Sequence, residues 1–263
     1  MAASTKSALK KVLKKGYVTV NDQLATTATF IKGGEIIQLT IPTEIKSTKK
    51  LIFPLQLIYE DDYLAIVYKP AGILVSGNSF KTIANALPQN IQQSKLPDAT
   101  IPQPVHRLDY GTTGALLIGK TNNAVRLLNK LFEDKEIKKT YYAVAIGKMS
   151  LQRTISAPID LKESLTDYSV QEAVFSEKYE ILNLVKLTPK TGRRHQIRKH
   201  LASIGNPILG DQDYGKRGFI LKGKGIYLHA YSLEFIHPFF NKKLYFTATI
   251  PKKFTKIFSK LDD

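Results

Sequence analysis

The stretch that decides the fold is PVHRLDYGTTGALLI, residues 104–118, because it places ionisable side chains between an apolar run and a turn with two glycines. Val105, Arg107 and Asp109 alternate as in a strand that ends at a turn, and residues 115–118 then read as a buried strand. Asp109 is therefore expected at the turn, on a rigid support. Taken alone, Arg107 and Asp109 fit a surface ion pair as well as a functional site.

A second stretch, TPKTGRRHQIRKHLA at residues 188–202, changes that balance. It passes from a strand through a turn with proline and glycine into a helix. Ile197, Leu201 and Ile204 recur with helical spacing and form the apolar face of this helix. Arg198 lies on a neighbouring face, so the helix can pack on a core and still present a cation.

Arginine is concentrated in these two stretches. The chain has 39 lysines and arginines, and most are lysine, yet four of its few arginines fall here: Arg107, Arg193, Arg194 and Arg198. Arginine offers a planar fork for bidentate contact with a carboxylate or a phosphate, whereas lysine supplies a point charge. The pattern therefore indicates fixed geometry at these positions.

Two further segments, Gly210-Asp211 and Leu228-His229-Ala230, complete a pattern that resembles the RluA-type RNA pseudouridine synthases. The resemblance runs from about Phe53 to the end of the chain, and His106 favours the branch with an HRLD motif. It implies an α+β fold with a mixed, mainly antiparallel sheet flanked by helices. It also implies conversion of uridine to pseudouridine within RNA, without an external cofactor.

The resemblance also implies a catalytic group. Asp109 matches the catalytic aspartate of the family, and Arg198 matches the partner that keeps this carboxylate ionised in an apolar pocket. A carboxylate in this role attacks as a nucleophile or abstracts a proton, and the sequence does not choose between the two. Ile197 would pack under the base, although it is also the first residue of an apolar stripe and thus fits plain core.

Residues 138–146 alternate as a strand, so the adjacent Tyr141 and Tyr142 point to opposite faces. The Lys-x-Tyr pattern of the family falls on Tyr141, which we expect to stack on a flipped uracil, with two structural tyrosines as the alternative. The remaining candidates for substrate binding are His106, Arg107, Lys69, Arg193, Arg194 and His195. Lys69 lies in a Lys-Pro-Ala-Gly loop, where an exposed lysine would contact phosphate.

Composition points to a polyanionic partner. The formal charge is +17, from 39 basic and 22 acidic residues, which predicts salt-dependent binding of nucleic acid or a lysine-rich solvated surface. The absence of cysteine excludes disulfides and thiolate metal ligands. No run is long and apolar enough for a membrane span or a secretory signal, so a cytoplasmic protein is expected.

The chain is expected to have two domains. Residues 1–42 contain a basic amphipathic helix followed by strands and resemble a partial S4-type RNA-binding domain, residues 43–52 read as a linker, and residues 53–263 form the catalytic domain. The S4-like unit lacks an upstream helix of that family. It favours a structured substrate such as large-subunit ribosomal RNA, with transfer RNA as the alternative.

Two rival readings belong to other classes. A metal- or histidine-dependent nuclease would use His106, Asp109, His195 and His200, but the last two are five residues apart and lie on different faces of a helix, so no metal site is expected. A non-catalytic RNA-binding or ribosome-assembly protein would need only the charge and the S4-like unit. No obligatory protein partner is indicated, and a monomer is expected.

Overall fold

The computed structural model describes residues 6–40, 51–216, 218, 219, 221, 223 and 225–261. The chain divides into two compact units, residues 1–49 and residues 50–263. The division falls inside the linker predicted at residues 43–52, most of which lies outside the described residues. The domain limits and the S4 likeness stay predictions.

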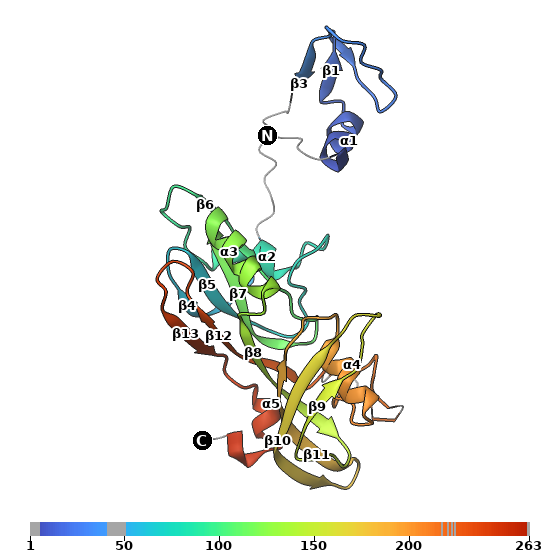
Figure 1. Ribbon diagram of the computed structural model, residues 1–263, viewed down its shortest axis with the longest axis vertical. Coiled ribbons are helices and arrows are strands. Elements are labelled where there is room, and N and C mark those ends of the chain that lie inside the picture. Colours follow the sequence, from blue (N-terminus) through green and yellow to red (C-terminus); the bar gives the residue numbers. More distant parts are fainter. Residues whose placement is uncertain are drawn as a thin grey trace. The chain divides into compact units, whose positions relative to one another are not determined.

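The first unit contains helix α1 (Lys6–Lys14), which Figure 1 shows beside β1 and β3. Its small antiparallel sheet has the strand order β2-β1-β3. Its strands are β1 (Val18–Val20), β2 (Gln23–Leu24) and β3 (Ile37–Leu39). Asn21 and Asp22 join β1 to β2 with positive φ angles of 49° and 64°, which suits these two residue types in a tight hairpin turn. The predicted helix and the strands that follow it are thus confirmed.

The second unit is built on one sheet of ten strands, with β4-β5-β7-β12-β8-β11-β10-β9 in order and with β13 beside β12 and β6 beside β7. The pairing is antiparallel except between β7 and β12, so the predicted mixed, mainly antiparallel sheet is confirmed. The strands are β4 (Gln56–Glu60), β5 (Leu64–Lys69), β6 (Ala99–Pro104), β7 (Thr113–Thr121), β8 (Lys138–Ile146), β9 (Gln152–Ser156), β10 (Leu165–Ser176), β11 (Glu180–Pro189), β12 (Leu228–Ile236) and β13 (Lys243–Thr247).

The parallel pair supports the loop that carries Asp109. Thr113 and Gly114 at the start of β7 lie beside His229 and Ala230 of β12. Gly114 has a φ of 121°, and a Cβ there would collide with the Ala230 carbonyl oxygen. Only glycine fits this approach, because it lacks a side chain and adopts positive φ without strain.

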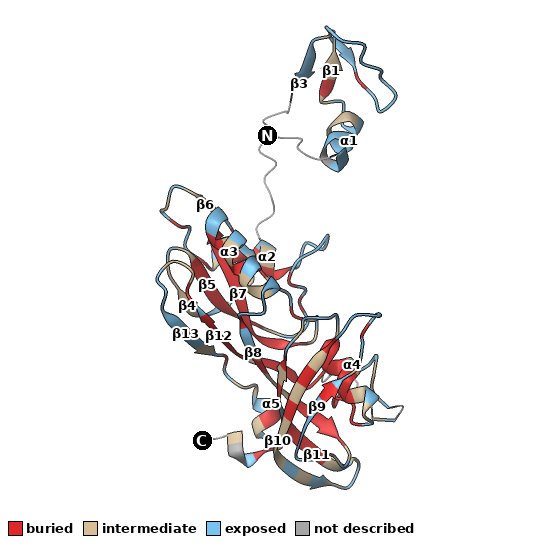
Figure 2. Cartoon of the chain, viewed as in Figure 1, coloured by how far each residue is buried: buried red, intermediate tan, exposed pale blue. Residues whose placement is uncertain are grey.

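Helices cover both faces of β7. The helical segments are α2 (Ile83–Ala86), α3 (Asn122–Glu133), α4 (Gln196–Ser203) and α5 (Lys252–Thr255), with short 3-10 turns at Leu87–Gln89 and Ser259–Leu261. Ile83 of α2 packs with Leu116, whereas Leu128 of α3 packs with Leu117, the next residue along β7. Strand alternation places these two contacts on opposite faces, and Figure 2 shows β7 buried along its length.

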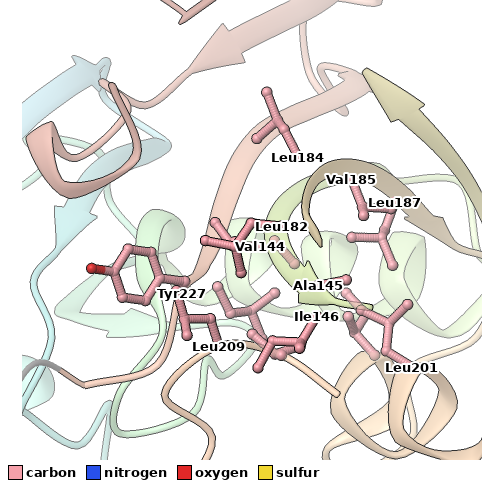
Figure 3. Close-up of a cluster of buried hydrophobic side chains, with 14 of the residues drawn as sticks. Val144, Ala145, Ile146, Leu182, Leu184, Val185, Leu187, Leu201, Leu209 and Tyr227 are labelled. Atoms are coloured by element: carbon pink, nitrogen blue, oxygen red, sulfur yellow. The ribbon is translucent and has the colours of Figure 1, made fainter. Parts of the chain in front are cut away.

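A third cluster of buried side chains joins β8, β11 and α4. Val144, Leu184 and Leu201 are at most 1% exposed and belong to this cluster, which Figure 3 shows. Leu201 lies one turn after Ile197 on the predicted apolar face of α4, so the helix is anchored through that face. The position of Arg198 is therefore set by core packing.

Some expectations are corrected. Residues 105–109 do not continue a strand: β6 ends at Pro104, and residues 105–112 form the loop between β6 and β7. Strands β6 and β9 each have a single buried residue and lack the alternation that identifies a half-buried strand. No helix among the described residues has the length and apolar character needed to cross a membrane.

Candidate active site

Three segments that are far apart in the sequence line one cleft of about 680 Å³. They are the β6–β7 loop, the region from the end of α3 into β8, and the turn that leads into α4. The volume lies within the range of about 300–1,000 Å³ that small-ligand pockets occupy. Nine of the ten predicted site residues line the cleft: Asp109, Tyr141, Arg198, His106, Arg107, Ile197, Arg193, Arg194 and His195.

Asp109 lies between the guanidinium group of Arg198 and the imidazole ring of His195. Its Oδ2 atom is 3.8 Å from Nη1 of Arg198, and its Oδ1 atom is 3.7 Å from Nε2 of His195. Both distances exceed those of a hydrogen bond. The side chain of Asp109 is 25% exposed and lines the cleft. The guanidinium of Arg198 lies close to this carboxylate but does not donate a hydrogen bond to it.

Arg198 is held by carboxylates other than Asp109. Its Nε and Nη2 atoms donate to the two oxygens of Asp211 at 2.8 and 2.6 Å, and Nη2 also donates to Asp213 at 2.6 Å. Burial acts to lower the pKa of Arg198, but the bonds to Asp211 and Asp213 raise it above its ordinary value. The guanidinium stays charged, and its Nη1 atom is the one that lies near Asp109.

Asp211 is itself buried, with 1% of its surface exposed. Burial acts to raise its pKa, yet the bonds from Arg198 and from the backbone N–H groups of Tyr214 and Asp213 lower it overall. Sequence reasoning noted Asp211 only as part of the family pattern and gave it no role. Asp211 and Arg198 are 13 positions apart in the sequence, a separation at which spacing alone does not predict a contact.

His195 joins the site through an unusual backbone conformation. It precedes α4 with a φ of 55°, and its Nδ1 atom shares a hydrogen bond of 3.0 Å with the Tyr214 hydroxyl. Burial lowers the pKa of His195 despite the nearby charge of Asp109. The imidazole is therefore neutral at neutral pH.

Tyr141 and Ile197 form apolar walls of the cleft. Ile197 is 6% exposed and belongs to the core cluster, and it also lines the cleft. Its packing under the base stays a prediction. Burial, and then the charge of Asp109, raise the pKa of Tyr141, which keeps its phenol protonated. Tyr142 does not line the cleft, and its ring lies 4.9 Å from that of Tyr231.

The prediction for Lys69 is wrong. This side chain is fully buried, and its Nζ atom donates to the carbonyl oxygens of Pro70, Tyr110 and Thr112 at 3.0, 3.2 and 2.8 Å. All three donors of the ammonium group are used. Lys69 therefore ties the loop that follows Asp109 to the end of β5 and does not face RNA phosphate.

His106 has a structural role in addition to lining the cleft. Its Nε2 atom accepts a hydrogen bond of 2.9 Å from the backbone N–H of Leu117, and its ring lies 4.6 Å from that of Phe132. Burial, and then the charge of Lys139, lower the pKa of His106 to about 3. His106 is thus a neutral acceptor that fixes the loop, although it still lines the cleft.

Exposed arginines surround the opening of the cleft. Arg107, Arg193 and Arg194 are exposed, and Arg193 donates from Nε to the Glu163 carbonyl oxygen at 3.1 Å. Thr112 was not predicted: its buried hydroxyl lines the cleft and has no partner in the described part of the chain. A lone threonine beside a glycine turn carries no sequence signal for that position.

His200, one of the three histidines that a nuclease would use, does not face the cleft. The ring of His200 is buried and bonds to Ser164, Thr166 and the Ala157 carbonyl oxygen, away from the cleft residues. Within the ranges that the structure describes, no group of three or more potential ligands is arranged to hold a metal ion.

Comparison with known proteins identifies the family. Residues 63–203 match the family model described as RNA pseudouridylate synthase. An uncharacterized RNA pseudouridine synthase of Aquifex aeolicus is 34% identical over 287 residues, covering 98% of this chain and 90% of the relative. The ribosomal large subunit pseudouridine synthase D of Nitrosomonas europaea is 33% identical, covering 94% and 77%.

A solved structure shows the same fold. Human RNA pseudouridylate synthase domain containing 1 superposes with a TM-score of 0.63 at 23% identity, covering 78% of this chain and 86% of that one. The sequence matches and this fold agree with the resemblance read from the HRLD and TGRRHQIR stretches. The chain belongs to the RNA pseudouridylate synthase family and is an RNA uridine-to-pseudouridine isomerase.

Proposed function

We propose that the cleft holds one uridine of large-subunit ribosomal RNA and that Asp109 is its catalytic carboxylate. The observation that carries the proposal is the position of Asp109, which faces the cleft 3.8 Å from a guanidinium that two other carboxylates hold in place. The substrate is taken from relatives that carry the name ribosomal large subunit pseudouridine synthase. An RNA substrate also agrees with the expected cytoplasmic location.

The target nucleotide must leave its stack to reach Asp109. A stacked or paired uridine is inaccessible, so the base is flipped into the cleft and held on aromatic and apolar side chains. Tyr141 and Ile197 supply such walls. Arg107, Arg193 and Arg194 at the opening supply charge for the flanking phosphates.

The reaction exchanges one bond for another. The bond from uracil N1 to ribose C1′ breaks, the base turns, and a bond from C5 to C1′ forms. The hydrogen at C5 leaves as a proton while N1 gains one, so the atoms balance without an external reactant. Asp109 serves as nucleophile or as proton acceptor, and in both cases it must be ionised, which the neighbouring charge of Arg198 favours.

The test is to map pseudouridines in total RNA from cells with and without the gene. The expected result is the loss of pseudouridine at one or more positions of large-subunit ribosomal RNA. Expression of the wild-type chain restores these positions, whereas Asp109→Asn does not. Loss confined to transfer RNA would overturn the substrate, and restoration by Asp109→Asn would overturn the role of the carboxylate.

A further inference from the structure

The sheet carries a tyrosine cluster on the face away from the cleft. Side chains alternate along β8, so Tyr142 points to the face opposite Tyr141. The rings of Tyr142 and Tyr231 are 4.9 Å apart with an interplanar angle of 61°. Tyr245 of β13 lies opposite Glu234 of β12, which in turn lies opposite Lys138 of β8. Lys138 and Tyr142 share one face of β8, so the three tyrosines lie on the same face of the sheet.

Lysines lie in register with these tyrosines. Lys186 of β11 is exposed and lies directly opposite Tyr142. Lys138 and Lys243 lie on either side of Glu234 on β12, with N–O distances of 3.6 and 2.6 Å. We call this face the tyrosine surface, and it consists of Tyr142, Tyr231, Tyr245, Lys138, Lys186 and Lys243. Three lysines and one carboxylate leave it positively charged.

The tyrosine surface has the dimensions of a short nucleotide segment. It crosses four neighbouring strands, β13, β12, β8 and β11, and adjacent strands are about 4.8 Å apart, so it spans about 14 Å. Tyr245 is 58% exposed, and Figure 2 shows β13 as largely exposed. Such a surface offers flat rings for bases and ammonium groups for phosphates, with one aliphatic neighbour, Ile236, at 55% exposure.

We propose that the tyrosine surface binds a single-stranded segment of RNA outside the nucleotide that is modified. One exposed and two half-buried tyrosines interleaved with lysine match single-stranded nucleic acid, because bases stack on rings irrespective of sequence and lysines neutralise phosphates. A duplex would hide its bases from the rings. The inference shares with the proposed function only the premise that the partner is RNA, and it assigns a second contact area.

The experiment uses a fluorescein-labelled oligoadenylate of ten nucleotides, which contains no uridine for the active site. Its binding to the full chain is measured by fluorescence anisotropy for wild type, Tyr245→Ser and Lys186→Ala. Each variant is expected to bind about five- to fiftyfold more weakly, as for the loss of one stacked base or a phosphate contact. Tyr245→Phe, which keeps the ring, is expected to bind as wild type does.

Phe175→Ser is the matched control, because Phe175 is 81% exposed on the hairpin of β10 and β11, outside the tyrosine surface. It should leave the affinity unchanged. The same oligonucleotide with 8-azidoadenosine is then cross-linked by light, and the labelled peptides are expected to include β13, none of whose residues lines the cleft.

Three outcomes would overturn the inference: wild type that does not bind the probe at 100 mM salt, unchanged affinity in both Tyr245→Ser and Lys186→Ala, or cross-links confined to residues that line the cleft. Asp109→Asn is expected to bind the probe normally. Failure of the proposed chemistry would thus appear in activity alone, separate from failure here.

Discussion

Asp211 accepts hydrogen bonds from both Nε and Nη2 of Arg198, at 2.8 and 2.6 Å, and this bidentate contact leaves Nη1 within 3.8 Å of Asp109. Because the guanidinium group is planar and rigid, a carboxylate that binds its Nε and Nη2 atoms also fixes the position of Nη1. The position of the cation beside Asp109 therefore depends on a buried residue that does not line the cleft.

Asp211→Asn should impair both folding and activity. The amide cannot accept both hydrogen bonds of the fork and removes the charge that balances buried Arg198, so the free energy of unfolding should fall by about 3–5 kcal/mol. Turnover should fall by about a hundredfold, because Arg198 loses its alignment. Urea unfolding and single-turnover assays measure the two effects.

The control for Asp211→Asn is Asp160→Asn, which removes the ion pair of Asp160 with Lys199 at the surface. A surface pair contributes little, so both measurements should stay near wild type. Equal effects of the two substitutions would show that the contact between Asp211 and Arg198 has no special role.

Tyr141→Phe and Tyr141→Leu should separate stacking from the hydroxyl. Phenylalanine keeps the ring, so substrate RNA should bind within about twofold of wild type. Leucine removes a stacking contact of about 1–3 kcal/mol, which weakens binding by about five- to 150-fold. Filter binding with Asp109→Asn as the background measures affinity without turnover. Equal affinity of the two variants would argue that Tyr141 is structural.

Arg194→Ala should reduce RNA affinity and its dependence on salt. The loss of one phosphate contact lowers the slope of log K against log salt by about 1. Arg126→Ala is the matched control, since Arg126 is exposed on α3 but does not line the cleft. If both substitutions change the slope alike, the charge at the cleft opening acts only through the net charge of the chain.

His106→Gln should change how stability depends on pH. In the folded chain burial lowers the pKa of His106 from 6.5 to about 3, so between these values the unfolded chain takes up the proton. The stabilisation by the neutral ring is therefore complete above pH 6.5 and is lost as pH falls toward 3. The advantage of wild type over His106→Gln should shrink by roughly 3 kcal/mol between pH 7.5 and 4.5, measured by urea unfolding. An advantage that stays constant with pH would contradict this account.

The periodicity of the sequence predicted those parts of the site that depend on a single helix or strand. Helix α4 follows from the spacing of Ile197, Leu201 and Ile204, and the separation of Tyr141 from Tyr142 follows from strand alternation. The assignment of Asp109 and Arg198 to one site came from the family pattern, because nothing in the spacing of two residues 89 positions apart requires a contact.

What the sequence could not predict depends on distant contacts. Lys69 looks exposed in its Pro/Gly loop, but carbonyl groups from residues 110 and 112 enclose it only in the fold. Strands β6 and β9 lack alternation because their neighbours leave them partly in solvent. Asp211 gains its role through a loop that brings it back to α4.

The place of β12 has a consequence for synthesis on the ribosome. This strand comes late in the chain, yet it lies between β7 and β8, which are made more than 80 residues earlier. Until it emerges, the nascent polypeptide has two half-sheets with open edges, and the glycine turn beneath Asp109 lacks its support. The site can form only after β12 has been synthesised, so terminated products that end before residue 228 lack this strand and are expected to be inactive and prone to self-association.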